Sequence, residues 1–158
     1  MKYRAAWFLC LMLVGWVGCR SGPEELESRY ADLVAADDDG ARGRGWIPRF
    51  VPASARDIIE RHNIETNEIW LTFRKDEKEL GGIADRCEEI PAAEVLWPAR
   101  VPDWWPETLR GEGGGGEARL LRCSVPHKMG GVRFRRVGYM SLSASGDQVW
   151  YWETSPAS

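Results

Sequence analysis

The sequence has few histidines and few cysteines, and it contains none of the common catalytic motifs. Its 158 residues include two His and four Cys, so few side chains are available for a zinc or transition-metal site. It contains neither a His-Glu-x-x-His metal motif nor a Gly-x-Ser-x-Gly nucleophile elbow. Its 21 basic and 24 acidic residues give a net charge of -3, which does not indicate a nucleic-acid binder. We therefore expect no cofactor, no metal site and no nucleic-acid partner.

The longest apolar segment, residues 5–18, is too short to span a membrane as a helix. Its 14 residues would rise about 21 Å, against a hydrocarbon thickness of about 30 Å. Lys2 and Arg4 precede the segment, and Cys19 follows Gly18. A basic start, a short apolar core and a small residue before the cleavage site are typical of an export signal.

The end of this segment resembles the lipobox of bacterial lipoproteins. Residues 16–19 read Trp-Val-Gly-Cys, with Trp16 at a position where an aliphatic residue is typical. We expect residues 1–18 to be a cleaved lipoprotein signal peptide and Cys19 to be lipidated. The alternative is an ordinary secretory leader, cut nearby, with Cys19 unmodified. Lipidation would place the protein on the cell membrane or the outer membrane, facing the periplasm or the exterior.

The remaining cysteines predict a disulfide. Cys10 leaves with the signal peptide, and Cys19 carries the lipid. An even pair in an exported domain, here Cys87 and Cys123, most simply forms a disulfide. The rival interpretation is two buried free thiols that pack as small hydrophobes. We favour the disulfide, which would close a loop of about 36 residues.

Apolar residues at helical spacing predict two helices near the start of the mature chain. Within residues 22–38, apolar side chains recur at i, i+4, i+7 and i+8, as on one face of an amphipathic helix. Ser54 is suited to the N-cap of a second, shorter helix. That helix would turn Ile58 and Ile59 inward and end at His62.

Alternating apolar and polar residues predict about four strands. They are residues 68–74, 119–125, 132–143 and 148–153. The side chains expected in the core are Ile69, Leu71, Phe73, Leu121 and Val125, with Ile58 or Ile59 from the second helix. The Gly-rich residues 111–117 form a flexible linker by composition. The expected fold class is α+β: one domain over residues 19–158, with short helices packed on a small antiparallel sheet of about four strands.

A basic segment without acidic residues lies in the last third of the chain. Its basic residues are Arg119, Arg122, Lys128, Arg133, Arg135 and Arg136. Each basic residue near an anionic membrane surface adds about 1 kcal/mol of attraction, and an anionic glycan or an envelope protein would serve equally well as a partner. The alternative is a solvated face that pairs with the acidic N-terminal half. We favour the solvated face and keep these six residues as candidate contacts with an anionic surface.

The enzyme hypothesis depends on His62. A base at His62, oriented by Glu65 or Asp57, would titrate near neutral pH. However, a histidine at the end of a short helix is more often a cap, and no converging nucleophile and oxyanion donors are recognisable. We therefore predict a structural role for His62 and no catalytic residue. We predict that His127 lies in an exposed turn.

Five short motifs resemble, as a set, a known family. They are Arg44-Gly-Trp-Ile-Pro48, Pro52-Ala-Ser-Ala55, Thr66-Asn-Glu-Ile-Trp-Leu-Thr-Phe73, Trp104-Trp-Pro106 and Val149-Trp-Tyr-Trp152. They are similar to a group of uncharacterised bacterial lipoproteins with a YbbD head-type domain, over about residues 46–152. The resemblance implies an exported small α+β domain and carries no activity over.

The sequence thus predicts a lipid-anchored cell-envelope protein that acts as a non-enzymatic binding or interaction module. Two other classes stay open: a small envelope hydrolase centred on His62, and an immunity or inhibitor lipoprotein that blocks a basic toxin or enzyme. A convergent polar pocket around His62 would favour the hydrolase. An exposed acidic or aromatic patch away from any pocket would favour a binder or an inhibitor.

Overall fold

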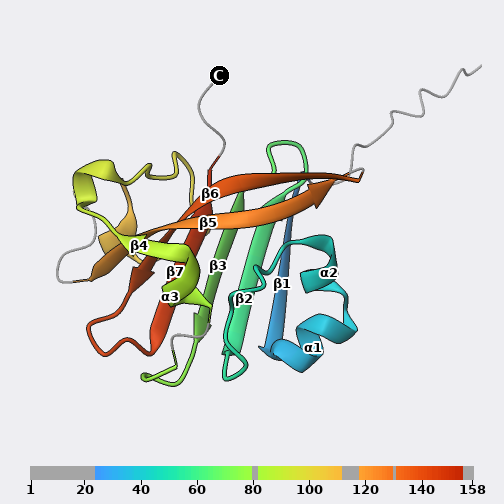
Figure 1. The fold of residues 1–158 in the computed structure, drawn as a ribbon, viewed down its shortest axis with the longest axis horizontal. Coiled ribbons are helices and arrows are strands. Elements are labelled where there is room, and N and C mark those ends of the chain that lie inside the picture. Colours follow the sequence, from blue (N-terminus) through green and yellow to red (C-terminus); the bar gives the residue numbers. More distant parts are fainter. Residues whose placement is uncertain (1–23, 80–81, 112–117, 130, 155–158) are drawn as a thin grey trace, which may run out of the picture.

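The protein folds as one twisted antiparallel sheet with short helices packed on it (Figure 1). The computed structural model describes residues 24–79, 82–111, 118–129 and 131–154. The predicted signal peptide, Cys19 and residues 112–117 of the predicted linker lie outside the described residues. In the described part of the chain, no helix is long and apolar enough to cross a membrane.

The sheet has seven strands, in the order β1-β2-β3-β7-β6-β5-β4. The strands are β1 (Glu25–Asp32), β2 (Arg56–Asn63), β3 (Ile69–Arg74), β4 (Cys87–Glu89), β5 (Arg119–Met129), β6 (Val132–Leu142) and β7 (Gln148–Glu153). Every neighbouring pair is antiparallel. Strands β1, β2 and β3 are neighbours in the order of the chain, and β4 forms the opposite edge of the sheet. Strands β5, β6 and β7 then fill the space between β4 and β3, with β7 paired to β3. The expected antiparallel sheet is therefore present, but the expected number of four strands is wrong.

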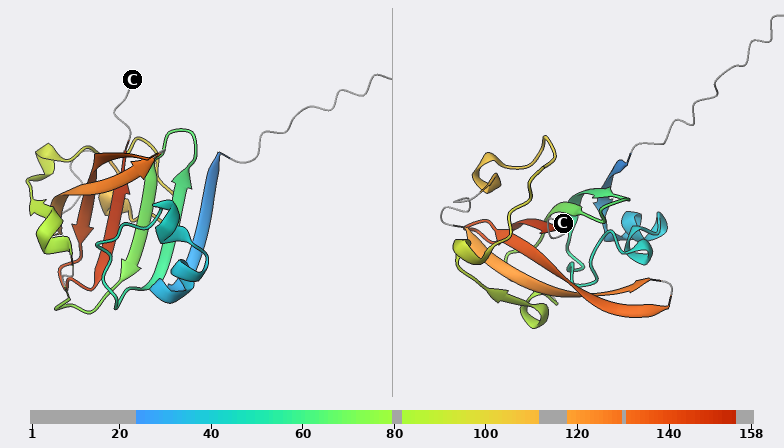
Figure 2. Two further views of the ribbon diagram at one scale, coloured as in Figure 1. Left: turned by 45° about the vertical axis from the view of Figure 1, so that its right-hand side comes forward. Right: turned by 90° about the horizontal axis from the view of Figure 1, so that it is seen from above.

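The helices are short and lie mainly on one face of the sheet. They are α1 (Leu33–Asp38), α2 (Ala41–Arg44) and α3 (Ile83–Arg86), with 3-10 turns at Ala92–Glu94 and Glu107–Leu109. Figure 2 shows α1, α2 and the segment that follows them in front of β1 to β3. We call this side of the sheet the helix face. The opposite side, which residues 90–109 cover, is the tryptophan face.

The four predicted strands are confirmed as β3, β5, β6 and β7. The predicted core is also confirmed, because Ile69, Leu71, Phe73, Leu121, Val125 and Ile58 are all buried. Trp70 and Thr72, on the other face of β3, are buried as well. Both faces of this central strand are therefore covered. Alternate side chains of β3 point into two different cores, and neither set faces solvent.

The predicted N-terminal helix over residues 22–38 is wrong for most of its length. Residues 25–32 form β1, and only Leu33–Asp38 is helical. Leu26 and Tyr30 are four positions apart, which places them on one side of a strand as well as of a helix. The pattern is therefore ambiguous, and pairing along β2 decides the outcome.

The predicted second helix, from Ser54 to His62, is also wrong. Residues 56–63 form β2, which pairs with β1 on one side and β3 on the other. Strand alternation places Ile58, Glu60 and His62 together on the helix face. His62 is therefore an interior sheet residue and not a helix cap.

Each face of the sheet has its own core. On the helix face, residues such as Leu71, Phe73 and Tyr151 pack against α1, α2 and residues 47–55. On the tryptophan face, the fully buried Trp152 is central. The rings of Trp97, Trp105 and Tyr139 lie 5.6, 5.8 and 5.9 Å from it. The tryptophans of the described residues are thus used in packing.

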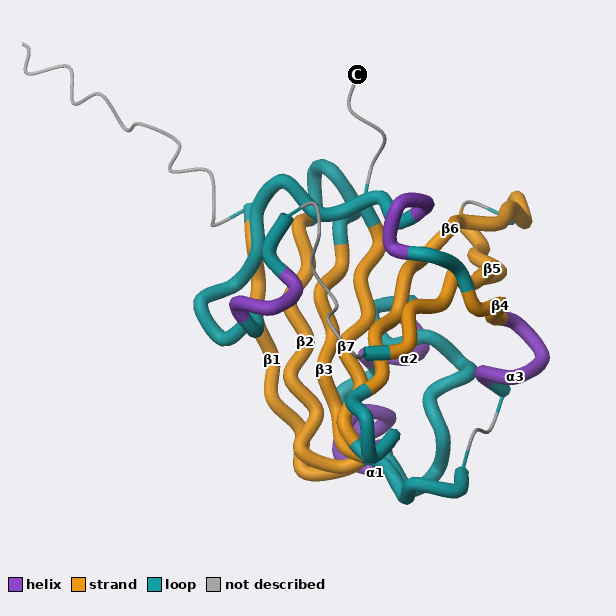
Figure 3. Tube along the Cα trace, turned by 90° about the vertical axis from the view of Figure 1, so that its left-hand side faces the viewer, coloured by secondary structure: helices purple, strands orange, loops and turns teal. Residues whose placement is uncertain are grey.

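The predicted disulfide between Cys87 and Cys123 is present. The two residues are direct partners in the β4–β5 pair, and their Cα atoms are 4.0 Å apart. The bond attaches the three-residue edge strand β4 to the long β5–β6 hairpin. Since α3 leads directly into β4, the bond also holds α3 near β5, as Figure 3 shows.

Candidate anion-binding cleft

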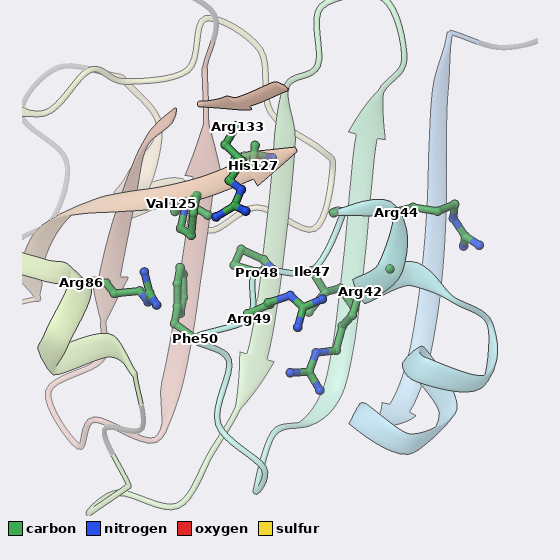
Figure 4. A pocket seen from close by; sticks show the side chains of 13 residues that line it. Arg42, Arg44, Ile47, Pro48, Arg49, Phe50, Arg86, Val125, His127 and Arg133 are labelled. Atoms are coloured by element: carbon green, nitrogen blue, oxygen red, sulfur yellow. The ribbon is translucent and has the colours of Figure 1, made fainter. Parts of the chain in front are cut away.

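A cleft on the helix face is lined by arginines (Figure 4). It has a volume of about 600 Å³ and lies between the segment from α2 to Phe50, α3 and the β5–β6 hairpin. The basic residues on its walls are Arg42, Arg44, Arg49, Arg86, His127 and Arg133. Among the described residues that line it, none is acidic.

Three of the five arginines have no ion-pair partner among the described residues. Arg42 pairs with Asp37 at 3.0 Å, and Arg44 pairs with Asp39 at 2.6 Å. The three arginines without such a pair are Arg49, Arg86 and Arg133. Figure 4 shows Arg44 pointing away from the cleft, toward β1. The net positive charge of the cleft therefore comes from the three unpaired arginines.

The segment after α2 forms one wall of the cleft. Gly45 ends α2 with a φ of 90°, a left-handed conformation that favours glycine. Ile47 and Phe50 are then buried in the helix-face core, where the Phe50 ring meets the Tyr151 ring edge-on at 5.3 Å. Arg49, between these two apolar anchors, is exposed. The anchors fix the backbone and so hold Arg49 at the cleft.

The opposite wall is α3, which carries Arg86. Ile83 buries one side of this helix, and Cys87 follows Arg86 directly. Gly82, just before α3, approaches the first wall closely: a Cβ placed on it would lie 3.3 Å from Phe50 Cβ. The core and the disulfide therefore keep the two walls at a fixed separation.

His127 links the cleft to a buried carboxylate. Its Nε2 lies 3.3 Å from Glu153 Oε1, and Glu153 is fully buried. Tyr151 donates to the same oxygen at 2.6 Å, and Arg136 Nε lies 3.0 Å from Oε2. The other ring nitrogen, Nδ1, faces Gly45, where an added Cβ would lie 3.8 Å away. Glu153 thus orients the imidazole.

The chemistry of the cleft suits an anion. Guanidinium groups form short, charge-assisted hydrogen bonds with phosphate, sulfate and carboxylate groups, often in pairs. Within the described residues, no group of three or more His, Cys, Asp or Glu is arranged to hold a metal ion. The arrangement therefore offers recognition of negative charge by nitrogen donors.

The six basic residues selected from the sequence do not form one surface. Arg119 and Arg122 lie on β5 and pair with glutamates of β4. Arg136 turns inward to Glu153, with only 19% of its side chain exposed. Arg133 lines the cleft, and Arg135 is exposed and donates to a serine of β5. The segment therefore divides among four different environments.

The prediction that His127 lies in an exposed turn is wrong. Strand β5 continues to Met129, where it still pairs with β6. The His127 side chain is 14% exposed and stacks on Phe134, with ring centroids 5.7 Å apart. Pro126 indicated a turn in the sequence, but strand β5 continues through this residue. The side chain of the neighbouring Lys128 lies outside the described residues.

Sequence reasoning missed most of the cleft. Arg42, Arg49 and Arg86 are far in sequence from the basic segment, and Glu153 lies in the last strand. The one available signal was the concentration of four arginines in residues 42–49 and 56 around Gly and Pro. That signal does not show which of these arginines find an acidic partner.

A second polar cluster is buried under Trp46. Glu60 and His62 are almost fully buried, with Glu60 Oε1 2.6 Å from His62 Nδ1. The Trp46 ring stacks on the imidazole at 3.7 Å. Burial raises the pKa of Glu60 to about 8, and burial together with Arg44 lowers the pKa of His62. At pH 7 the protonated Glu60 therefore donates to the neutral His62.

His62 does not line the arginine cleft. Its Nδ1 is occupied by Glu60, and Trp46 covers the ring face. The predicted cap at a helix end is wrong, since the residue lies in β2. Its structural role stays a prediction, and the placement gives no support to a hydrolase centred on it.

The Glu60–His62 pair makes stability depend on pH. Folded Glu60 keeps its proton up to about pH 8, whereas the ordinary pKa is 4.5. The pKa of His62 is lowered in the folded protein from its ordinary value of 6.5. The unfolded chain therefore binds the extra proton at His62 mainly below pH 6.5, and only there does His62 offset the decline caused by Glu60. Stability should therefore fall by about 1.5 kcal/mol between pH 6.5 and pH 8, with a slope of at most about 1.4 kcal/mol per pH unit. Glu60→Gln should remove this decline in urea unfolding experiments, and an unchanged decline would contradict the assignment.

The fold and the cleft define a small antiparallel α+β domain with a cationic cleft on its helix face. Residues 24–74, from β1 to β3, match the family model of the YbbD head domain. The match confirms the resemblance for this part of the chain, which includes the first three of the five motifs. The motifs at Trp104–Pro106 and Val149–Trp152 lie beyond it. No curated protein and no solved structure matches the chain significantly.

Proposed function

We propose that the protein is a lipid-anchored cell-envelope binding module, without catalytic activity, that holds an anionic ligand in the arginine cleft. The observation that carries the proposal is the gathering of Arg49, Arg86 and Arg133 around one cleft without acidic partners among the described residues. The leader with its Gly18-Cys19 junction supports the envelope location.

Charge balance supports a ligand with more than one negative charge. Nearby guanidinium groups of like charge repel one another, and a bound anion converts this repulsion into attraction. Elsewhere on the protein, arginines such as Arg119 and Arg122 already have glutamate partners. The cleft differs from these sites because its positive charge is left unbalanced. We infer a ligand that carries phosphate, sulfate or several carboxylate groups.

Calorimetric titration with tripolyphosphate at low ionic strength tests the proposal. The protein should bind this probe, and binding should weaken as salt screens the charges. Arg49→Gln removes one charged donor, for which a loss of about 1.5–3 kcal/mol is typical, or at least about tenfold in affinity. Arg49→Gln combined with Arg86→Gln should lower the affinity further.

Arg119→Gln is the matched control, because Arg119 is an exposed arginine of β5 that pairs with Glu89 outside the cleft. It should leave the affinity for tripolyphosphate unchanged. Absence of binding to the unaltered protein would contradict the proposal. An equal loss in the Arg119 and Arg49 variants would show a diffuse charge effect and would also contradict it.

A further inference from the structure

The outer half of the β5–β6 hairpin exposes apolar and basic side chains together. Strand β6 pairs with β7 only from Tyr139 to Leu142, so the outer half is a two-stranded ribbon that extends beyond the sheet (Figures 1 and 2). Val132 is 67% exposed and the large Phe134 is 39% exposed. Arg133 and Arg135 alternate with them and are also exposed. We call residues 132–135 the hairpin end.

The hairpin end lies at the same end of the molecule as the start of the described chain. Ile64, in the β2–β3 turn, donates its N–H to the Glu24 carbonyl at 2.9 Å. Arg136, just beyond the hairpin end, donates to the Asn67 carbonyl of the same turn at 2.6 Å. Figures 1 and 3 show the start of β1, this turn and the hairpin at the upper end.

This end also exposes further apolar side chains. Leu26, near the start of β1, is 43% exposed, and Ile64, in the adjoining turn, is 51% exposed. The exposed acidic residues Glu24 and Glu65 lie beside them. By contrast, no acidic residue occurs between Ala118 and Gly146, the span that contains the whole hairpin. Attraction to negative charge is therefore a property of the hairpin end and not of the β1 side.

The length of chain before Glu24 sets how far this end can lie from a membrane. Glu24 lies five positions after Cys19, and five steps of fully extended chain span at most about 17 Å. A lipid on Cys19 would hold the start of β1 within that distance of the bilayer. Since the hairpin occupies the same end of the molecule, the anchor would turn the hairpin toward the headgroups.

We propose that the hairpin end is a second membrane contact, in which Val132 and Phe134 enter the headgroup region of an anionic bilayer and Arg133 and Arg135 meet lipid phosphates. An aromatic ring beside basic side chains is the combination that favours this interface. The geometry depends on the lipid anchor of the proposed function. It shares Arg133 with the cleft, so the test below uses Val132 and Arg135, which do not line the cleft.

The experiment uses the processed full chain purified from its membrane and mixed with vesicles of phosphatidylglycerol or of phosphatidylcholine. Val132→Cys is labelled with the polarity-sensitive fluorophore NBD, and Ala144→Cys is the matched control. Ala144 is exposed in the β6–β7 turn, at the opposite end of β7 from Glu153. Mass spectrometry of the intact protein shows whether Cys19 carries lipid and whether one label is bound.

We expect the protein to sediment with both kinds of vesicle through its lipid. The emission of the label at position 132 should shift to the blue with phosphatidylglycerol vesicles, and the label at 144 should stay in an aqueous environment. In the unlipidated full chain with Cys19→Ser, Arg135→Gln should lower partitioning into phosphatidylglycerol vesicles about fivefold. Arg119→Gln, away from the hairpin end, should not change it.

The outcomes separate the hairpin from the anchor. The protein could sediment with the vesicles while the emission of the label at 132 shows an aqueous environment, or while the labels at 132 and 144 shift equally to the blue. Either result would overturn the hairpin contact and leave the anchor in place. Processed protein with an intact Cys19 that mass spectrometry shows to lack lipid, and whose label at 132 still shifts with phosphatidylglycerol, would support the hairpin contact and overturn the anchor. Protein that sediments with neither kind of vesicle would overturn both.

Discussion

Replacing Cys87 and Cys123 together by serine is expected to lower the free energy of unfolding by about 4 kcal/mol, because the bond closes a loop of 36 residues in the unfolded chain. The loss should also be local in the folded state. Strand β4 has three residues and pairs only with β5 among the described strands. Without the bond, α3 and Arg86 should lose their fixed position at the cleft.

Urea unfolding of the double variant, compared with the oxidised and reduced unaltered protein, measures this effect. The double variant and the reduced protein should agree in stability, since both lack the bond. Tripolyphosphate binding should weaken in the double variant, because one wall of the cleft carries Arg86. A double variant as stable as the oxidised protein would contradict the stabilising role of the disulfide.

Arg136→Met is expected to destabilise the protein by about 3–5 kcal/mol, the range observed when one partner of a buried ion pair is removed. Glu153 is fully buried, and Arg136 is its only arginine or lysine partner among the described residues. Methionine keeps much of the volume of the Arg136 side chain but leaves the carboxylate without its cation. Tyr151 and His127 remain as its hydrogen-bond partners.

A double-mutant cycle separates this charge effect from packing. Glu153→Gln removes the buried charge and keeps an oxygen that can accept from Tyr151. The Arg136→Met and Glu153→Gln changes together should therefore be much less destabilising than the sum of the two single changes. Strict additivity in urea unfolding would show that the two side chains do not interact and would contradict the ion pair.

Strands were predicted correctly where apolar and polar residues alternate over a long segment or where the sequence contains a clear turn motif. Strand β3 alternates over six residues, and the β6–β7 hairpin has Gly146 at a turn with a φ of 75°. Strands β1 and β2 failed because their apolar residues are few and their spacing fits either a helix or a strand. The Gly and Pro near them mark breaks in the chain but not the type of element between the breaks.

The cleft was harder to predict from the sequence than the strands were. Its three unpaired arginines come from the segment after α2, from α3 and from β6. A basic residue shows in the sequence as a charge, but whether it is neutralised depends on which acidic side chain the fold places within about 4 Å. Arg136 and Arg133 illustrate this, since they are three positions apart. One neutralises a buried carboxylate, and the other faces the cleft.

Local sequence patterns were enough to predict strands β3, β5, β6 and β7, the buried side chains of the helix face and the disulfide. The strands and the core follow from alternation, and the disulfide follows from the small number of cysteines. The three-dimensional fold was needed to show that β1 and β2 are strands, that Glu60 and His62 share a buried hydrogen bond, and that arginines from distant segments line one cleft. Each of these depends on contacts between residues far apart in sequence, whose free energy outweighs the weak local preference of the segment for helix or strand.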